Sequence, residues 1–217
     1  MTSAIIVAAG SSRRMGFDKL FADLSGKPVL ARSLAAFHDH PEIDEVIVVT
    51  STSNWEQIRG WNPQTKLVEG GSERHFSVAN GLNAVSPDCW LVAIHDGARP
   101  LIHAESISAC IKGAREQGAA SCARRITETL KRADDSCRVT ESVDRDHLWA
   151  METPQCFQLE LIRRSYQQVL ETDKIVTDEV SAVEALGEPV YLIENPHPNL
   201  KVTFPSDLVL ASRLLDA

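Results

Sequence analysis

The sequence predicts an α/β protein built on a mostly parallel, doubly wound sheet. Short apolar runs recur along the chain and helix-like stretches separate them, which is the pattern of βαβ units rather than of a β-sandwich. The chain has 217 residues, a length that an open α/β sheet with helices on both faces commonly fills as one unit. We therefore expect a single domain over residues 1–217.

Each expected strand is a short apolar run. In chain order these runs cover residues 4–8, 45–50, 66–68, 90–95, 119–123 and 190–194. Helical spacing marks two of the intervening helices, at Val29, Leu30, Ser33, Leu34 and Phe37 and at Val78, Leu82 and Val85. Ligands of such sheets bind beyond the carboxyl ends of the strands, near the switch in strand order. The loop that starts at Gly10 and the segment after His95 should therefore share one rim.

A polar segment interrupts this alternation between about residues 127 and 148. Its sequence, TETLKRADDSCRVTESVDRDHL, is charged and has strand-like residues on both sides of an expected turn at 134–136. A long polar insertion with a central turn favours a hairpin over a helix. We expect a β-arm inserted into the sheet domain.

Composition limits the classes of partner. The formal net charge of −8 disfavours nonspecific nucleic-acid binding, and no apolar run approaches the roughly 18 residues of a membrane span. The five cysteines form no CxxC pair, and the first residues lack a basic leader segment. We therefore expect a cytoplasmic protein with reduced thiols and with neither a nucleic acid nor a membrane as partner.

The first loop, AAGSSRRMGFDK, places three cations close together after an apolar strand. Arg13, Arg14 and Lys19 lie in a segment that fits neither the Walker A pattern nor the dinucleotide fingerprint. A strand, a glycine turn and several cations can still form an anion cradle, and a polyphosphate would neutralise all three charges. The alternative is a solvated turn whose charges face water.

Two further segments carry polar residues that could contribute to a site. In GGSERHFSVANGL, a Gly70-Gly71 turn precedes a helix expected from Ser72, so that Arg74 and Ser77 could contact a base or ribose. In HDGARP, the carboxylate of Asp96 ends an apolar strand and could hold Mg²⁺. The alternatives are a plain loop–helix junction in the first segment and, in the second, a loop cap paired with Arg99.

Eight segments, taken in order, resemble one family along almost the whole chain: AAGSSRRMGFDK, GGSERHFSVANGL, HDGARP, TLKRA, VDRDHLW, TPQ, TDE and NLKVT. That family is 2-C-methyl-D-erythritol 4-phosphate cytidylyltransferase, an enzyme of the non-mevalonate route to isoprenoids. The resemblance implies a Rossmann-like nucleotidyltransferase sheet. It also implies transfer of CMP from CTP to methylerythritol phosphate, with Mg²⁺ as cofactor and pyrophosphate as the second product.

The resemblance also implies roles for particular residues. Catalytic roles fall to Arg14, Lys19, Asp96 and Lys201. CTP contacts fall to Ala8, Ala9, Gly10, Arg14, Lys19, Gly71, Ser72, Arg74, Ser77 and Asp96, with Asp96 also the metal ligand. Contacts with the second substrate fall to Arg99, Thr129, Arg145, Thr153, Thr177 and Lys201. Thr129 and Arg145 lie on the arm, which in this family crosses to a partner subunit, so the resemblance implies a homodimer with a shared site.

The chain departs from the family pattern at two places. Gly10-Ser11-Ser12 stands where many members have a G-x-G turn, and Glu128 stands where the arm is expected to carry an aspartate. Thr177, which precedes an acidic pair, would serve equally well as the N-cap of the following helix. Three alternatives remain open at this stage: a ribitol-5-phosphate cytidylyltransferase, a nucleotidyltransferase for another base, and a non-catalytic nucleotide-binding regulator.

Overall fold

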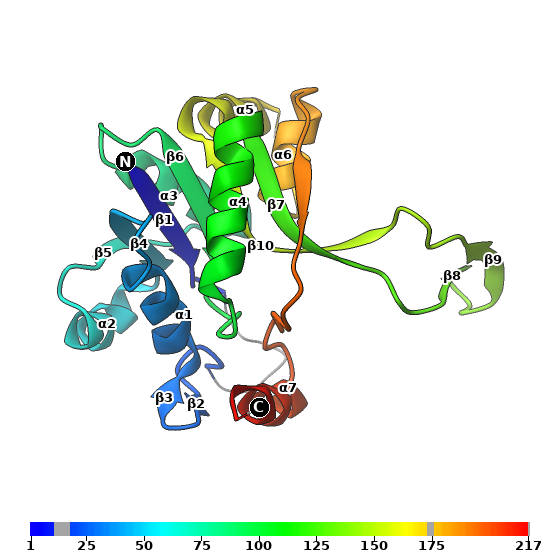
Figure 1. Cartoon of the computed structure of the whole chain (residues 1–217), viewed down its shortest axis with the longest axis horizontal. Helices are drawn as coiled ribbons and strands as arrows, with labels where there is room; N and C mark the ends of the chain where they lie inside the picture. Colours follow the sequence, from blue (N-terminus) through cyan, green and yellow to red (C-terminus); the bar gives the residue numbers. More distant parts are fainter. Residues whose placement is uncertain (11–17, 173–175, 217) are drawn as a thin grey trace.

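A central sheet with helices on both faces dominates the part of the chain that the computed structural model describes, residues 1–10, 18–172 and 176–216 (Figure 1). In these residues the sheet has seven strands in the order β11-β7-β10-β6-β1-β4-β5. The strands are β1 (Thr2–Val7), β4 (Glu45–Thr50), β5 (Lys66–Glu69), β6 (Leu91–Asp96), β7 (Ala119–Arg125), β10 (Trp149–Gln158) and β11 (Tyr191–Glu194). All neighbours pair in parallel except β10, which runs antiparallel to β6 and to β7. The predicted fold class is confirmed.

β10 is absent from the strands that the apolar pattern predicts. This strand carries buried polar residues, among them Glu152, Thr153 and Gln155, in place of a continuous apolar run. Their side chains are hydrogen-bonded to segments distant in the sequence, so burial costs little free energy. The six strands that the sequence predicts are present, with ends that differ by at most two residues.

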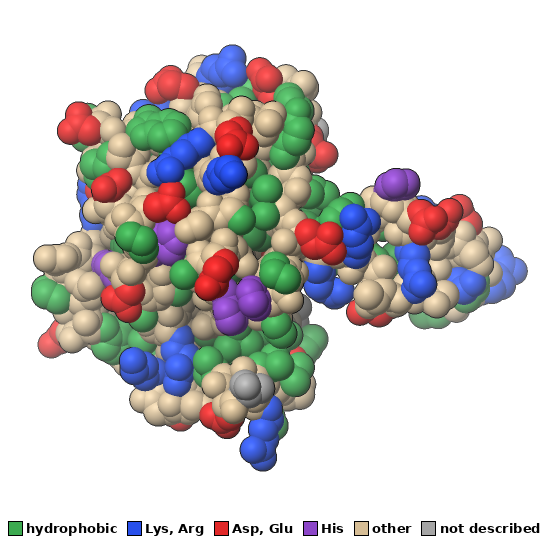
Figure 2. Space-filling model, in the orientation of Figure 1, with side chains coloured by type: hydrophobic (Ala, Val, Ile, Leu, Met, Phe, Trp, Pro, Cys, Tyr) green, Lys and Arg blue, Asp and Glu red, His purple; other side chains and the backbone are tan. Residues whose placement is uncertain are grey.

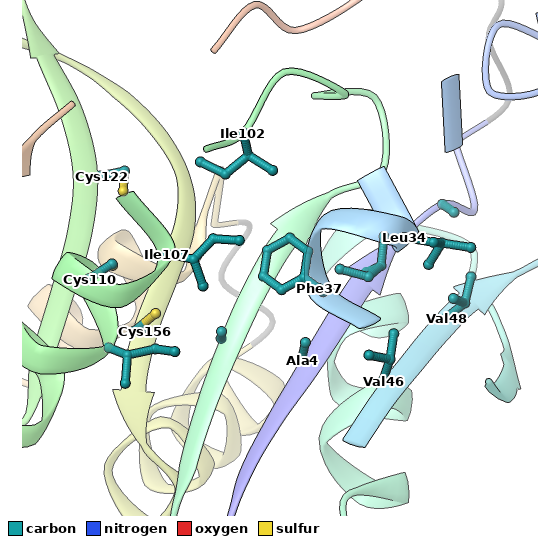
Figure 3. Packing of buried hydrophobic residues seen from close by; sticks show 14 of the residues in the cluster. Ala4, Leu34, Phe37, Val46, Val48, Ile102, Ile107, Cys110, Cys122 and Cys156 are labelled. Carbon is teal, nitrogen blue, oxygen red and sulfur yellow. The ribbon is translucent and has the colours of Figure 1, made fainter. Parts of the chain in front are cut away.

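Two apolar layers hold the helices against the sheet. One face packs α1 (Val29–His38), α2 (Trp55–Trp61) and α4 (Ala104–Gln117), and the other packs α3 (Arg74–Ala84), α5 (Leu159–Glu171) and α6 (Glu179–Ala185). Ala4 and Ile6 of β1 face the first layer while Ile5 faces the second, as strand alternation requires. Figure 3 shows Phe37 of α1 and Ile107 of α4 next to each other in the first layer.

Two helix starts differ from the expectation. α3 begins at Arg74 with Glu73 at the N-cap, rather than at Ser72. α6 has Asp178, not Thr177, as its N-cap, because the Asp178 carboxylate accepts a 3.0 Å hydrogen bond from the Ser181 amide. A cap of this kind stabilises a helix by about 1 kcal/mol.

The polar insertion forms a hairpin that extends away from the sheet (Figure 1). Its strands are β8 (Leu130–Ala133) and β9 (Val139–Val143), and the Asp134 carboxylate accepts hydrogen bonds from the amides of Ser136 and Arg138 in the turn between them. The sequence-predicted turn is confirmed.

The last helix, α7 (Pro205–Leu215), packs on the small hairpin of β2 (Asp23–Leu24) and β3 (Lys27–Pro28). The contact is a separate small core of Leu24, Val29, Leu101, Val202 and Ala211. A single-turn 3-10 helix, η1 (Thr52–Asn54), precedes α2. In the described part of the chain, no helix has the length and apolarity needed to span a membrane.

Candidate active site

The predicted rim forms where β1 and β6 end side by side. The Gly97 amide donates a 3.0 Å hydrogen bond to the Val7 carbonyl, and the Ala8 amide donates a 2.8 Å bond to Val49. A Cβ atom on Gly97 would lie 2.8 Å from Leu30 and 3.2 Å from the Val7 carbonyl oxygen. The turn after β6 therefore needs glycine, and it holds Asp96 against the end of β1.

Three cations converge on the carboxylate of Asp96. Lys201 Nζ lies 2.9 Å from Oδ2, Arg99 Nε lies 3.4 Å from the same oxygen, and Arg74 Nη2 lies 3.4 Å from Oδ1. Burial alone would raise the pKa of Asp96, but Lys201, Arg74 and Arg99 outweigh it and hold that pKa well below its ordinary value. Asp96 is therefore ionised at neutral pH, and the rim carries an excess of positive charge.

Arg74 is fixed by a buried carboxylate on the far side of its guanidinium. Nη1 and Nη2 bind the two oxygens of Glu179 at 2.5 and 3.0 Å, and Glu179 is fully buried. The Tyr166 hydroxyl donates to Glu179 at 2.9 Å. Burial would lower the pKa of Arg74. The charge and hydrogen bonds of Glu179 outweigh burial and hold that pKa above its ordinary value. Arg74 therefore lies as a fixed link between Asp96 and the start of α6.

The start of α6 is anchored to β10 by Gln155. Its Oε1 atom accepts hydrogen bonds of 3.1 Å from the amides of Glu179 and Val180, and its Nε2 donates to the Asp178 carboxylate at 3.0 Å. An unpaired amide at this helix start would be costly in a buried position. Gln155 thus fixes the start of α6 in the position where Glu179 binds Arg74.

His95 and Thr153 hold the backbone around Asp96 in place through hydrogen bonds. The Asp96 amide donates to the Thr153 hydroxyl at 3.1 Å, and His95 Nε2 lies 3.1 Å from the Arg99 carbonyl oxygen, which can only accept. Nε2 therefore carries the ring proton, and the Thr153 hydroxyl donates to Nδ1 at 2.9 Å. Complete burial lowers the pKa of His95 to about 4, so the ring is neutral. Thr153 is only 4 % exposed, and in this structure its hydroxyl holds the strand end together.

The glycine-rich turn before α3 packs closely against the end of β1. A Cβ atom on Gly70 would lie 2.3 Å from the Ala9 Cβ, and one on Gly71 would lie 2.4 Å from the Phe76 Cβ. The Gly71 amide donates to the Ser77 hydroxyl at 3.0 Å. Ala9, the two glycines and Ser77 therefore come together beside Arg74, the residue of α3 that contacts Asp96.

The remaining predicted site residues divide into two groups. Lys19 reaches the rim, since its Nζ donates a 2.8 Å hydrogen bond to the carbonyl of Val202, next to Lys201. Ser72 and Gly10 are exposed beside the rim segments. Arg14, like Arg13, lies outside the described residues.

Three predicted residues do not join the Asp96 cluster within the chain. Thr129 and Arg145 are exposed on the arm, where Arg145 donates to the Thr127 carbonyl. Thr177 is exposed next to the α6 N-cap, and its hydroxyl lies 3.4 Å from that of Ser181.

The sequence pattern did not identify the residues that hold the rim cations in place through hydrogen bonds. Glu179, Tyr166 and Gln155 were not proposed, although Glu179 is the last residue of the TDE segment. Asn199 was also missed: its carbonyl accepts a 2.7 Å hydrogen bond from Arg99. The usable signal was the presence of acidic and amide residues in segments that are otherwise apolar and buried.

Cations gathered around one ionised carboxylate, at the carboxyl ends of the parallel strands β1 and β6, are typical of α/β enzymes that bind the phosphate groups of a nucleotide. Residues 2–217 match the family model of 2-C-methyl-D-erythritol 4-phosphate cytidylyltransferase. The chain belongs to this family and is therefore a nucleotidyltransferase. The predicted resemblance and enzyme class are confirmed.

Relatives named 2-C-methyl-D-erythritol 4-phosphate cytidylyltransferase align along nearly the whole chain. One from Caldanaerobacter subterraneus subsp. tengcongensis is 42% identical and covers 98% of each chain, and one from Alkaliphilus oremlandii is 40% identical over 99% of this chain and 94% of its own. The structure is similar to a crystal structure of 4-diphosphocytidyl-2C-methyl-D-erythritol synthase from Anaerococcus prevotii. That likeness has a TM-score of 0.88 at 30% identity and covers 100% of this chain and 98% of the other.

A second solved structure, of 2-C-methyl-D-erythritol 4-phosphate cytidylyltransferase from Thermus thermophilus, gives a TM-score of 0.85. It is 30% identical and covers 98% of both chains. Sequence and fold therefore agree on the same family.

Proposed function

We propose that this protein transfers CMP from CTP to 2-C-methyl-D-erythritol 4-phosphate. The products are 4-diphosphocytidyl-2-C-methyl-D-erythritol and pyrophosphate, and the reaction is a step of isoprenoid biosynthesis by the non-mevalonate route. The match over residues 2–217 and the names of the relatives support this reaction. The observation that carries it is the convergence of Lys201, Arg74 and Arg99 on Asp96 at the end of β6. No observation favours ribitol phosphate, another base or a regulator.

The reaction is an in-line attack by a phosphate oxygen of methylerythritol phosphate on the α-phosphorus of CTP. The new bond joins that oxygen to the α-phosphorus, and the bond to the bridging oxygen of the β-phosphate breaks, so that pyrophosphate leaves with its electron pair. A phosphate monoester is mostly ionised near neutral pH, because its second pKa is about 6. The attacking group therefore needs no general base. Catalysis then consists of positioning and of neutralising charge.

Cations of the rim supply the neutralisation. We assign Arg14 and Lys19 to the triphosphate and Lys201 and Arg145 to the incoming phosphate. Lys201 is 42 % exposed at its side chain, so its ammonium can turn from Asp96 to a phosphate, while Arg74 and Arg99 still compensate the Asp96 carboxylate. Arg74 keeps its contact with Glu179 and serves as a fixed charge.

Asp96 fits the role of ligand to Mg²⁺. Mg²⁺ prefers oxygen ligands and is commonly held by one or two carboxylates together with substrate phosphates and water. Asp96 offers one ionised carboxylate at the rim. A bound phosphate would attract its neighbour Lys201 away from this carboxylate. When bound, the ion would supply positive charge to the phosphate oxygens. The other rim residues hold the substrates in line.

Small residues would form the surface that contacts the cytosine and ribose. We propose that the base rests on Ala8, Ala9 and the Gly70-Gly71 turn, whose close packing leaves backbone groups within reach. Ser77 accepts a hydrogen bond from the Gly71 amide, Ser72 follows the same turn, and Gly10 follows Ala9, so we include these three residues in the proposed surface. Small side chains at these positions support an approach of the ligand to the backbone.

The arm supports a homodimer in which each chain completes its partner's site. Thr129 and Arg145 are exposed on a hairpin that extends away from the sheet, so they are available to a second copy (Figure 1). Val139 on the same hairpin is 61 % exposed, as expected of an apolar side chain that a partner covers. We propose a cytoplasmic homodimer in which Thr129 and Arg145 act in the partner's site. In the same site, Thr153, Thr177 and Arg99 would contact methylerythritol phosphate.

Pyrophosphate release tests the proposed reaction. Purified protein with CTP and Mg²⁺ is assayed in parallel with methylerythritol phosphate and with ribitol 5-phosphate. Release with methylerythritol phosphate alone supports the proposal. Release with ribitol phosphate alone moves the protein to that substrate, and CTP binding without release from either contradicts enzymatic function.

A further inference from the structure

A second group of side chains with metal-binding chemistry lies at the other end of the loop that follows Asp96. His103 is the N-cap of α4, Glu105 is in its first turn, and His197 follows β11. One nitrogen or oxygen atom from each of the three lies within 4.8 Å of the others. Figure 2 shows histidine side chains gathered beside an acidic one where the start of α4 meets the segment after β11.

The two imidazoles are already paired in this structure. The rings of His103 and His197 stack with centroids 4.0 Å apart and planes 9° from parallel. His103 Nδ1 lies 4.0 Å from a carboxylate oxygen of Glu105. Each imidazole offers one ring nitrogen within 4.8 Å of the other ligand atoms, and imidazole nitrogen is a common metal ligand in proteins.

The backbones that carry the two histidines are tied together by one buried amide side chain. Asn195 Oδ1 accepts a 2.8 Å hydrogen bond from the Ser106 hydroxyl and a 3.2 Å bond from the His197 amide. Ser106 is itself bonded through its amide to the His103 carbonyl at 3.1 Å. The Asn195 amide group donates to buried Glu152 at 2.8 Å. The scaffold for a three-ligand site is therefore built before any ion arrives.

We propose that His103, Glu105 and His197 form a binding site for a first-row transition-metal ion, with Zn²⁺ the best match. Two imidazoles and one carboxylate, completed by water, form a known zinc donor set, and imidazole ligands select such ions over Mg²⁺. Atoms that share a tetrahedral zinc ion at about 2.0–2.2 Å lie about 3.4 Å apart. The side chains must close by about 1 Å and the rings must turn out of the stack. His103 and Glu105 are 49% and 78% exposed at their side chains, so both have room to turn toward a shared ion.

The position of this site gives it a consequence for the rim. Asn199 and Lys201 follow His197 in the same segment, and Arg99 precedes His103 in the loop after Asp96. An ion held by His103 and His197 would fasten the segment that carries Lys201 to the start of α4. The site is distinct from the Mg²⁺ site proposed at Asp96, and the inference goes beyond the proposed function.

The test is Zn²⁺ binding by untagged protein in excess Mg²⁺, measured by calorimetry. A Cys137→Ser background removes the exposed thiol, which would otherwise compete. The expected result is one equivalent of Zn²⁺ per chain, and visible absorption bands of a low-coordinate site when Co²⁺ replaces Zn²⁺. His197→Ala and Glu105→Gln should each weaken binding by at least about tenfold.

The matched control is His147→Asn on the arm, where asparagine tolerates the positive φ of 64°. This variant should bind Zn²⁺ as the parent does. Thermal unfolding in Mg²⁺ alone checks that each variant is folded. Absence of stoichiometric binding, or binding that His197→Ala leaves unchanged in folded protein, would overturn the proposal and leave the two rings as a packing contact.

Discussion

The buried pair of Arg74 and Glu179 gives a prediction whose magnitude follows from the structure. Glu179→Ala removes both hydrogen bonds to the guanidinium, at 2.5 and 3.0 Å, and takes the acceptor from the Tyr166 hydroxyl. Removing one partner of a buried ion pair costs about 3–5 kcal/mol, because the other charge stays buried without compensation. The Arg74 side chain is 28% exposed and keeps its contact with Asp96 at 3.4 Å, so its charge stays partly compensated and we expect the low end of this range, about 3 kcal/mol.

Urea unfolding measures this change in the free energy of unfolding. The dependence on urea should keep its slope, since the surface exposed on unfolding is the same. Glu184→Ala is the matched control, because Glu184 is an exposed residue of the same helix, and it should change stability by no more than about 0.5 kcal/mol. The double variant Arg74→Ala/Glu179→Ala should lose less than the two single losses together. A loss below about 1 kcal/mol for Glu179→Ala would refute the reasoning.

Three further predictions concern the site. Lys19→Ala should lower kcat/KM for CTP transfer by about 10²–10³-fold while exposed Lys27→Ala leaves it nearly unchanged; similar values for both variants in steady-state kinetics would contradict the role of Lys19. Buried His95 has a folded pKa of about 4 against an ordinary 6.5, so the unfolded chain binds the proton first and stability falls as pH drops from 6.5 to 4, by about 3 kcal/mol. His95→Gln should remove that share of the pH dependence in urea titrations, and an unchanged profile would show that His95 does not titrate as stated. Mixing Arg145→Ala chains with Lys19→Ala chains should restore one intact site in each mixed dimer, and verified heterodimers without activity would contradict an arm that acts in trans.

The part of the fold that could be predicted from sequence is the part set by local apolar pattern. The parallel strands β1, β4 and β6 each contain a run of four buried or nearly buried apolar residues, as expected of strands covered on both faces. β10 was not predicted, because Glu152, Thr153 and Gln155 are polar. Their hydrogen-bond partners lie far away in the sequence. A local pattern does not contain those partners.

The candidate site divides in the same way. Asp96 was predictable, because a carboxylate directly after a buried strand lies at the rim where ligands bind. The contact between Arg74 and Glu179 joins residues 105 positions apart, and no spacing rule predicts it. The pairing of His103 with His197 depends in the same way on how α4 and β11 lie in space. Resemblance to the family brought in residues on the arm that no geometry within one chain connects to Asp96.

The most direct test of the central claim is a crystal structure of the protein with CTP and Mg²⁺. We predict that the triphosphate binds at the carboxyl ends of β1 and β6, with the ion in contact with Asp96. Lys19 should contact the phosphates, while Arg74 remains bound to Glu179. Triphosphate bound away from this rim, or an Asp96 carboxylate still paired with Lys201 and contacting neither ion nor nucleotide, would contradict the account.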